Sequence, residues 1–142
     1  MEVNMTKEME DLEKQFILSE DMEHEDINGL VKRILNFCKV DTKGFVVIQK
    51  SGLIIPQRIM LVLSARYLAN KLQQKLGREN ISINEVVTLK ELSGMLKEKD
   101  TVIIARLKDL KDAKKVLSSE RGIYKVATYA IKDFLTELDG AK

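Results

Sequence analysis

Apolar residues recur at the three- and four-residue spacing of an amphipathic helix in most parts of the chain. The first stripe lies in an acidic arm over residues 1–25, in which Ser19 to Glu25 is a polar linker. A second helix follows, with Asp26 as its predicted cap. The stripe of the arm consists of Met5, Met9, Leu12 and Phe16, and that of the second helix of Ile27, Leu30, Val31, Ile34 and Cys38.

The longest apolar segment begins at Pro56 or Gln57 and ends near Leu76, where Gly77 stops the helix. Its apolar residues occupy more than one helix face, which predicts that several elements pack against it. The exposed side of this helix is predicted from its cations, Arg58, Arg66, Lys71 and Lys75.

Two shorter amphipathic helices follow. Thr88 and Glu91 have the spacing of a capping box, in which each side chain accepts a hydrogen bond from the backbone amide of the other residue. The second helix begins near Asp100 or Thr101, and either side chain can cap it. The predicted buried residues are Leu89, Leu92 and Leu96 in the first helix and Ile103, Leu107 and Leu110 in the second. Two such helices must cross sharply to share one core, as in a helix-turn-helix.

Short β-branched and aromatic runs predict two small hairpins. In the first, turn residues over 41–44 precede a strand over 45–48, unless this strand pairs with the second hairpin instead. In the second, strands that begin at Val116 and Ile123 flank turn-forming residues over 118–122, where Gly122 is free to adopt a positive φ. Val86 and Val87 are predicted to form a short edge strand of the same sheet.

These elements predict an α+β fold that is mainly helical. It divides into an acidic arm over residues 1–25, a helix with a hairpin over 26–55, a unit over 56–127 and a C-terminal helix over 128–142. The buried stripe of the last helix is predicted at Tyr129 or Ala130, Phe134 and Leu138. The arm can pack on the body, pair with a second subunit, fray or cover the basic surface, and the last helix can cap the body or form a homodimer.

Charge is distributed unevenly along the chain. Residues 1–30 carry ten acidic and two basic residues, a net charge of −8, whereas residues 31–142 carry twelve acidic and twenty-two basic residues, a net charge of +10. Residues 88–126 alone have ten basic and six acidic residues, a net charge of +4. A basic body with an acidic arm is typical of nucleic-acid-binding proteins, although a lysine-rich surface also favours solubility.

The order of a capped helix, a second helix and a hairpin resembles the winged helix-turn-helix domains of prokaryotic transcription regulators. The matching segments are ELSGML at Glu91–Leu96, VIIARLKDL at Val102–Leu110, AKKV at Ala113–Val116 and the wing around Arg121 and Gly122. Many such domains have a glycine where each of the two helices ends, and here those positions are Lys97 and Lys114. The resemblance implies a winged helix-turn-helix over 56–127, with extra N-terminal helices and a short β-hairpin.

The resemblance also implies a DNA-binding transcription regulator that uses a recognition helix over 101–112 and a wing over 118–125. Predicted phosphate contacts are Lys97, Lys99, Arg106, Lys108, Arg121 and Lys125, and the predicted groove-facing residues are Thr101, Ile104, Ala105 and Lys108. Arg121 is the strongest single candidate. Arg106 can equally pair with Asp109 or Glu98. Ile104 and Ala105 can contact a thymine methyl group but cannot form the bidentate hydrogen bonds that discriminate bases best.

Two other functions remain open from the sequence. One is a winged-helix module that binds a partner protein through Ile104 and its neighbours, and the other is a nucleic-acid-binding factor without sequence preference. Catalysis is not expected, because the glycines are isolated and the one histidine, His24, lies in the acidic arm. Cys38 is predicted to be a buried thiol, and no metal or cofactor is expected. The chain has no secretion signal and no apolar run of about 18 residues, which predicts a cytoplasmic protein.

Overall fold

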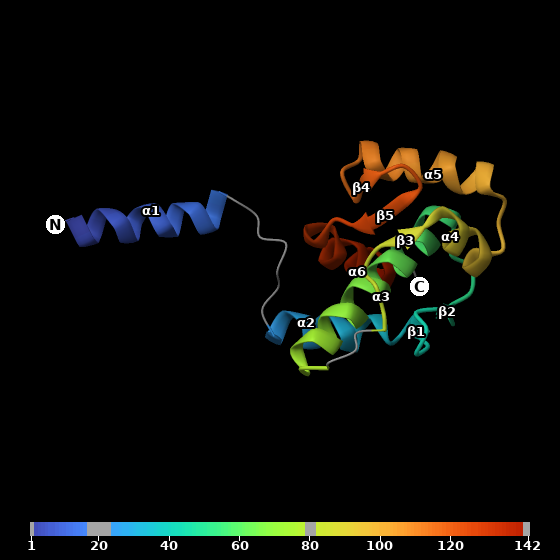
Figure 1. Ribbon diagram of the computed structural model, residues 1–142, viewed down its shortest axis with the longest axis horizontal. Coiled ribbons are helices and arrows are strands. Elements are labelled where there is room, and N and C mark those ends of the chain that lie inside the picture. The colour runs from blue at the N-terminus through green and yellow to red at the C-terminus, as the bar shows by residue number, and fades with distance from the viewer. Residues whose placement is uncertain (1, 17–23, 79–81, 141–142) are drawn as a thin grey trace.

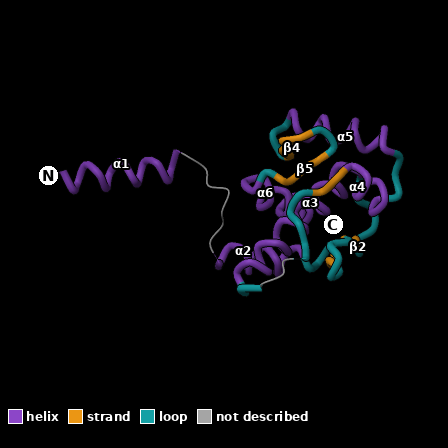
Figure 2. The backbone as a smooth tube through the Cα atoms, in the orientation of Figure 1, coloured by secondary structure: helices purple, strands orange, loops and turns teal. Residues whose placement is uncertain are grey.

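The computed structural model of this protein describes residues 2–16, 24–78 and 82–140. These residues form six α-helices, one short 3-10 helix and two small antiparallel sheets, which confirms the α+β class (Figures 1 and 2). The elements are α1 (Glu2–Phe16), α2 (His24–Ile34), β1 (Cys38–Val40), β2 (Val46–Ile48), α3 (Ile55–Lys75), β3 (Val87–Thr88), α4 (Leu89–Leu96), α5 (Asp100–Asp112), β4 (Val116–Glu120), β5 (Ile123–Val126), η1 (Thr128–Ala130) and α6 (Ile131–Gly140).

Helix α3 is the centre of the core, and α2, α4, α5, β1, β2 and β5 all contact it. Every residue from Ile59 to Leu68 is buried, which confirms that the helix packs against several partners. The helix starts at Ile55, one residue before Pro56, and the Ile54 amide donates a hydrogen bond of 3.1 Å to the Gln57 side chain. Gly77, at φ +70°, follows the last turn, as the sequence predicts.

The prediction that Arg66 lies on the exposed side of α3 is wrong. Only 4% of this residue is exposed, and its guanidinium donates four hydrogen bonds. Nε donates to the Asn84 carbonyl at 2.7 Å, Nη2 to the Val86 carbonyl at 3.1 Å, and Nη1 to the Gly44 carbonyl at 3.0 Å and the Glu91 carboxylate at 2.8 Å. The planar guanidinium, with five donors, can satisfy acceptors that converge from three chain segments. Arg66 therefore joins the β1–β2 turn, the segment before β3 and the start of α4.

Helix α2 differs from its predicted form at both ends. It begins at His24, so Asp26 lies inside the first turn and is not the cap. It ends at Ile34, and Cys38 opens β1, because the chain turns back after the helix to pair with β2. Cys38 is nevertheless buried as predicted, and burial raises the pKa of its thiol to about 12. Residues 19–23 of the predicted linker lie outside the described residues, while His24 and Glu25 belong to α2.

Strands β1 and β2 form a two-stranded antiparallel sheet of their own, so the alternative pairing with the second hairpin is wrong. The turn between them is held by Asp41. Its carboxylate accepts hydrogen bonds from the amides of Lys43 at 2.8 Å and Phe45 at 2.9 Å. The bond from the Phe45 amide is the main reason why the pKa of Asp41 lies below its ordinary value. This turn presents the Gly44 carbonyl to Arg66.

Helix α1 stands away from the body in Figure 1. Met9 and Leu12, two residues of its predicted stripe, are 68% and 56% exposed. The body does not cover these two side chains, so they do not support packing on the body, one of the alternatives that the sequence left open. Pairing of the arm with a second subunit stays a prediction.

Helix α6 closes the body after the short helix η1. Ala130, Phe134 and Leu138 are buried as predicted, whereas Tyr129 is 49% exposed and donates a hydrogen bond of 2.6 Å to the Lys114 carbonyl. The apolar stripe of α6 is buried in the core of the same chain, which agrees with a helix that caps the body. Dimerisation through α6 stays a prediction. None of the helices that the structure describes is long and apolar enough to cross a membrane.

Candidate nucleic-acid interface

Helix α4 begins with the capping box that the sequence predicts. The Glu91 amide donates to the Thr88 hydroxyl and the Thr88 amide donates to the Glu91 carboxylate, each at 3.1 Å. The second carboxylate oxygen of Glu91 accepts the bond from Arg66. Leu92 and Leu96 are buried as predicted. A local cap thus also anchors α4 to α3.

The Glu91 carboxylate is expected to make the folded chain less stable in acid than at neutral pH. Burial opposes its ionisation, but hydrogen bonds from Arg66 and the Thr88 amide outweigh burial and hold the pKa of Glu91 below its ordinary value. A lowered folded-state pKa adds stability that is fully present above the unfolded-state pKa and is lost as the pH falls through the folded-state pKa. We expect Glu91→Gln to lower stability at neutral pH and to remove this part of the acid sensitivity, as measured by urea midpoints between about pH 7 and about pH 3.

Glu120→Gln is the matched control, because Glu120 is exposed at the end of β4. It is expected to leave both the midpoint at neutral pH and its decline in acid close to those of the unaltered chain. A Glu91→Gln protein that loses stability in acid as steeply as the unaltered chain would contradict the prediction.

Both α4 and α5 are followed by a lysine in the left-handed conformation, Lys97 at φ 55° and Lys114 at φ 62°. These are the two positions at which the sequence has lysine where a glycine is common, and each costs about 1 kcal/mol. Arg58 stabilises the backbone around Lys97, because its guanidinium donates to the Leu96 carbonyl at 2.5 Å and pairs with Glu98 at 3.2 Å. The turn from α4 into α5 is therefore held by a side chain of α3.

Helix α5 begins at Asp100 as predicted, but its cap is Lys99, which makes no side-chain capping bond. The Asp100 carboxylate instead accepts hydrogen bonds from Lys90 at 2.8 Å and Ser93 at 2.5 Å, and these bonds hold the pKa of Asp100 below its ordinary value. The prediction that Asp100 or Thr101 caps the helix is wrong, because α4 lies close enough to recruit the carboxylate. The positive end of the α5 dipole therefore already has an anionic neighbour within the chain.

The two faces of α5 are distinct. Ile103, Leu107 and Leu110 are 0%, 1% and 7% exposed, which confirms the predicted core stripe. The predicted groove-facing residues Thr101, Ile104, Ala105 and Lys108 are all exposed on the other side of the helix. Arg106 pairs with Asp109 at 3.5 Å, one of its two expected partners, while Glu98 pairs with Arg58.

Strands β4 and β5 form the predicted second hairpin, with Val116 opposite Val126 and an irregularity between Leu117 and Glu120. Strand β4 continues to Glu120, so the turn is shorter than predicted and centres on Arg121 and Gly122, which has the expected positive φ of +79°. Strand β3 pairs with β5, giving the sheet order β3-β5-β4 and confirming the predicted edge strand.

Helix α5 and the β4–β5 hairpin lie side by side along one side of the body (Figure 1). Of the predicted contact residues on these elements, Lys125 is half-buried and all the others are exposed. Three further exposed cations lie at the end of α5 and before β4, namely Lys111, Lys114 and Lys115, and the sequence pattern did not point to them as contact residues. We call this set the α5–hairpin surface: Lys97, Lys99, Thr101, Ile104, Ala105, Arg106, Lys108, Lys111, Lys114, Lys115, Arg121 and Lys125.

Within the part of the chain that the structure describes, no group of three or more His, Cys, Asp and Glu side chains is placed to hold a metal ion. Comparisons with protein-family models, with curated proteins and with solved structures gave no match to this chain. Its function is therefore argued from its own residues.

Proposed function

We propose that this protein is a winged helix-turn-helix transcription regulator that binds double-stranded DNA, with α5 as the recognition helix and the β4–β5 hairpin as the wing. The chain order α3, β3, α4, α5, β4, β5 supports this fold assignment, as does the position of β5 between β3 and β4. The positions of Lys97 and Lys114 add to this support, because both adopt the left-handed conformation expected of the glycines that they replace.

The observation that carries the proposal is the charge of the α5–hairpin surface. Helix α5 itself has three basic and three acidic residues, so its net charge is zero. The excess of positive charge comes from the segments that flank the helix, which contribute Lys97, Lys99, Lys114, Lys115 and Arg121. Cations at both ends of a neutral helix suit two phosphate backbones on either side of a major groove, and phosphate contacts supply most of the non-specific affinity for DNA.

Binding to random-sequence duplex DNA tests the proposal. We expect fluorescence anisotropy to detect binding at about 50 mM salt and to show a fall in affinity towards about 200 mM salt, with a log–log slope of several units. Arg121→Glu is expected to weaken binding about tenfold and to make the slope shallower, because it removes a cation from the wing.

Arg78→Glu is the matched control. It reverses an exposed arginine just beyond the C-terminal end of α3, a helix end that lies on the opposite side of the body from α5 in Figure 1. Its DNA affinity is expected to stay close to that of the unaltered chain. Absence of binding by a folded chain at the lowest salt would refute the proposal, and equal losses for the two variants would refute the role of the wing.

A second candidate function is recognition of a partner protein through the same surface. Ile104 is 47% exposed and Leu117 is 36% exposed, and apolar side chains of this kind give little discrimination between bases. A selection of bound sequences from random DNA separates the remaining possibilities. Enrichment of one motif supports a regulator, binding without enrichment supports a factor without sequence preference, and absence of binding leaves the protein partner.

A further inference from the structure

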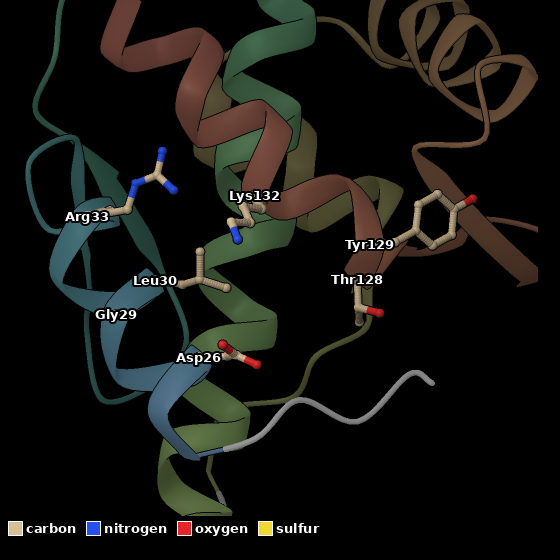
Figure 3. A pocket seen from close by; sticks show the side chains of 7 residues that line it. All are labelled: Asp26, Gly29, Leu30, Arg33, Thr128, Tyr129 and Lys132. Atoms are coloured by element: carbon tan, nitrogen blue, oxygen red, sulfur yellow. The ribbon is translucent and has the colours of Figure 1, made fainter. Parts of the chain in front are cut away.

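A pocket of about 400 Å³ lies between α2 and the η1–α6 segment (Figure 3). It shares no residue with the α5–hairpin surface. Its lining consists of Asp26, Gly29, Leu30 and Arg33 from α2, and Thr128, Tyr129 and Lys132 from η1 and α6. Its volume is in the range of sites for small molecules.

Three polar side chains of this pocket have no partner among the residues that the structure describes. Asp26 accepts no hydrogen bond there, and the ammonium group of Lys132 donates none. The hydroxyl of Thr128 is also unpaired, although only 9% of this residue is exposed. Among the described residues the buried side-chain oxygen without a partner is that of Ser64, so solvent, or a ligand in the pocket, reaches the Thr128 hydroxyl.

The charges of the pocket are separated and do not satisfy each other. In Figure 3 the Asp26 carboxylate comes from α2 and the Lys132 ammonium from α6, and both point into the space that Leu30 also enters. Asp26 and Lys132 form no ion pair with each other. The pocket thus offers one anion and one cation beside an apolar side chain.

The two remaining polar residues of the lining are already engaged elsewhere. Arg33 donates to Thr136 at 3.1 Å and pairs with Asp139 at 3.1 Å, and its guanidinium points away from the pocket in Figure 3. Tyr129 donates its hydroxyl to the Lys114 carbonyl. The free charge that faces the pocket from the described residues is therefore one carboxylate and one ammonium, which favours a ligand that carries both signs.

We propose that this pocket binds a small zwitterion of the α-amino-acid class. The ligand ammonium lies beside Asp26, its carboxylate lies beside Lys132, and its apolar side chain covers Leu30. Charge-assisted hydrogen bonds of both signs give such a site its selectivity, because a ligand that lacks one charge leaves the opposing group without a partner. The proposal does not depend on DNA binding.

Titration calorimetry of the full chain with L-leucine and L-phenylalanine tests the proposal. Two analogues of leucine separate the charges, since L-leucinamide lacks the carboxylate and 4-methylpentanoic acid lacks the ammonium. We expect at least one of the two amino acids to bind with a dissociation constant below about 10 mM. Loss of either charge from leucine is expected to weaken binding about tenfold or more.

Single substitutions assign each charge to its residue. Asp26→Asn is expected to weaken the binding of leucine and leucinamide but not that of 4-methylpentanoic acid. Lys132→Gln is expected to weaken the binding of leucine and 4-methylpentanoic acid but not that of leucinamide. Lys32→Gln and Asp133→Asn are the controls, because both residues are exposed neighbours that do not line the pocket. Their affinities should match that of the unaltered chain.

Three outcomes overturn the proposal. The first is no detectable binding of either amino acid by a chain whose circular dichroism is that of the folded protein. The second is equal binding of leucine and its two analogues. The third is binding that neither Asp26→Asn nor Lys132→Gln changes. Each of these leaves the DNA experiment unaffected, so failure of one proposal does not count against the other.

Discussion

Replacement of Arg66 with methionine is expected to lower the free energy of unfolding by about 3–5 kcal/mol. The substitution leaves the carbonyls of Gly44, Asn84 and Val86 without their buried donor, and an unsatisfied buried acceptor costs about 1–3 kcal/mol. It also removes the cation that pairs with Glu91. The site is tightly packed, since a Cβ atom added at Gly44 would lie 3.2 Å from Arg66 Cζ.

Urea unfolding followed by circular dichroism measures this loss. Arg66→Lys is expected to be intermediate, because an ammonium group keeps the charge but cannot match the fork of the guanidinium. Arg78→Met, at an exposed arginine, is expected to stay within about 0.5 kcal/mol of the unaltered chain. If Arg66→Met were no more destabilising than Arg78→Met, Arg66 would not be the link that joins three segments.

Alanine substitutions at the two adjacent isoleucines of α5 are expected to differ strongly in their effect on stability. Ile103 is fully buried at 0% exposure, so Ile103→Ala is expected to cost about 2–5 kcal/mol through lost burial and a residual cavity. Ile104 is 47% exposed, and Ile104→Ala is expected to change stability by less than about 0.5 kcal/mol, because the better helix propensity of alanine offsets a small loss of burial.

The same urea measurement compares the two variants, and equal losses would mean that the assignment of faces on α5 is wrong. Ile104→Ala also separates the proposed functions. Binding that depends on phosphate contacts is expected to survive this substitution nearly unchanged. A partner protein that uses Ile104 as an apolar anchor would instead lose about 1 kcal/mol or more of binding free energy.

The elements that local patterns predict are those whose determinants are close together in the sequence. The capping box of Thr88 and Glu91, the buried stripe of α5 and the positive φ of Gly122 each depend on a few neighbouring residues. The predicted exposure of the α5 contact residues follows from the same periodicity. The site could therefore be predicted as a surface, although its DNA-binding role stays a proposal.

The wrong predictions share a different cause. Asp100 and Asp26 have the chemistry of helix caps, but the first is recruited by Lys90 and Ser93 and the second lies inside a helix that begins earlier. Cys38 follows a helical spacing, yet strand pairing with β2 ends that helix. For Asp100 and Cys38, a contact made by another segment outweighs a weak local preference.

The sequence by itself determined the α+β class, most element positions, the core stripes of α4 and α5 and the split of charge between arm and body. Only the tertiary structure decided that Arg66 is buried, because its acceptors come from residues 44, 84, 86 and 91. The pocket between α2 and α6 likewise joins Asp26 to Lys132, more than a hundred residues apart. Periodicity reports which face of an element is apolar, whereas the partner of a polar side chain is set by how distant segments pack.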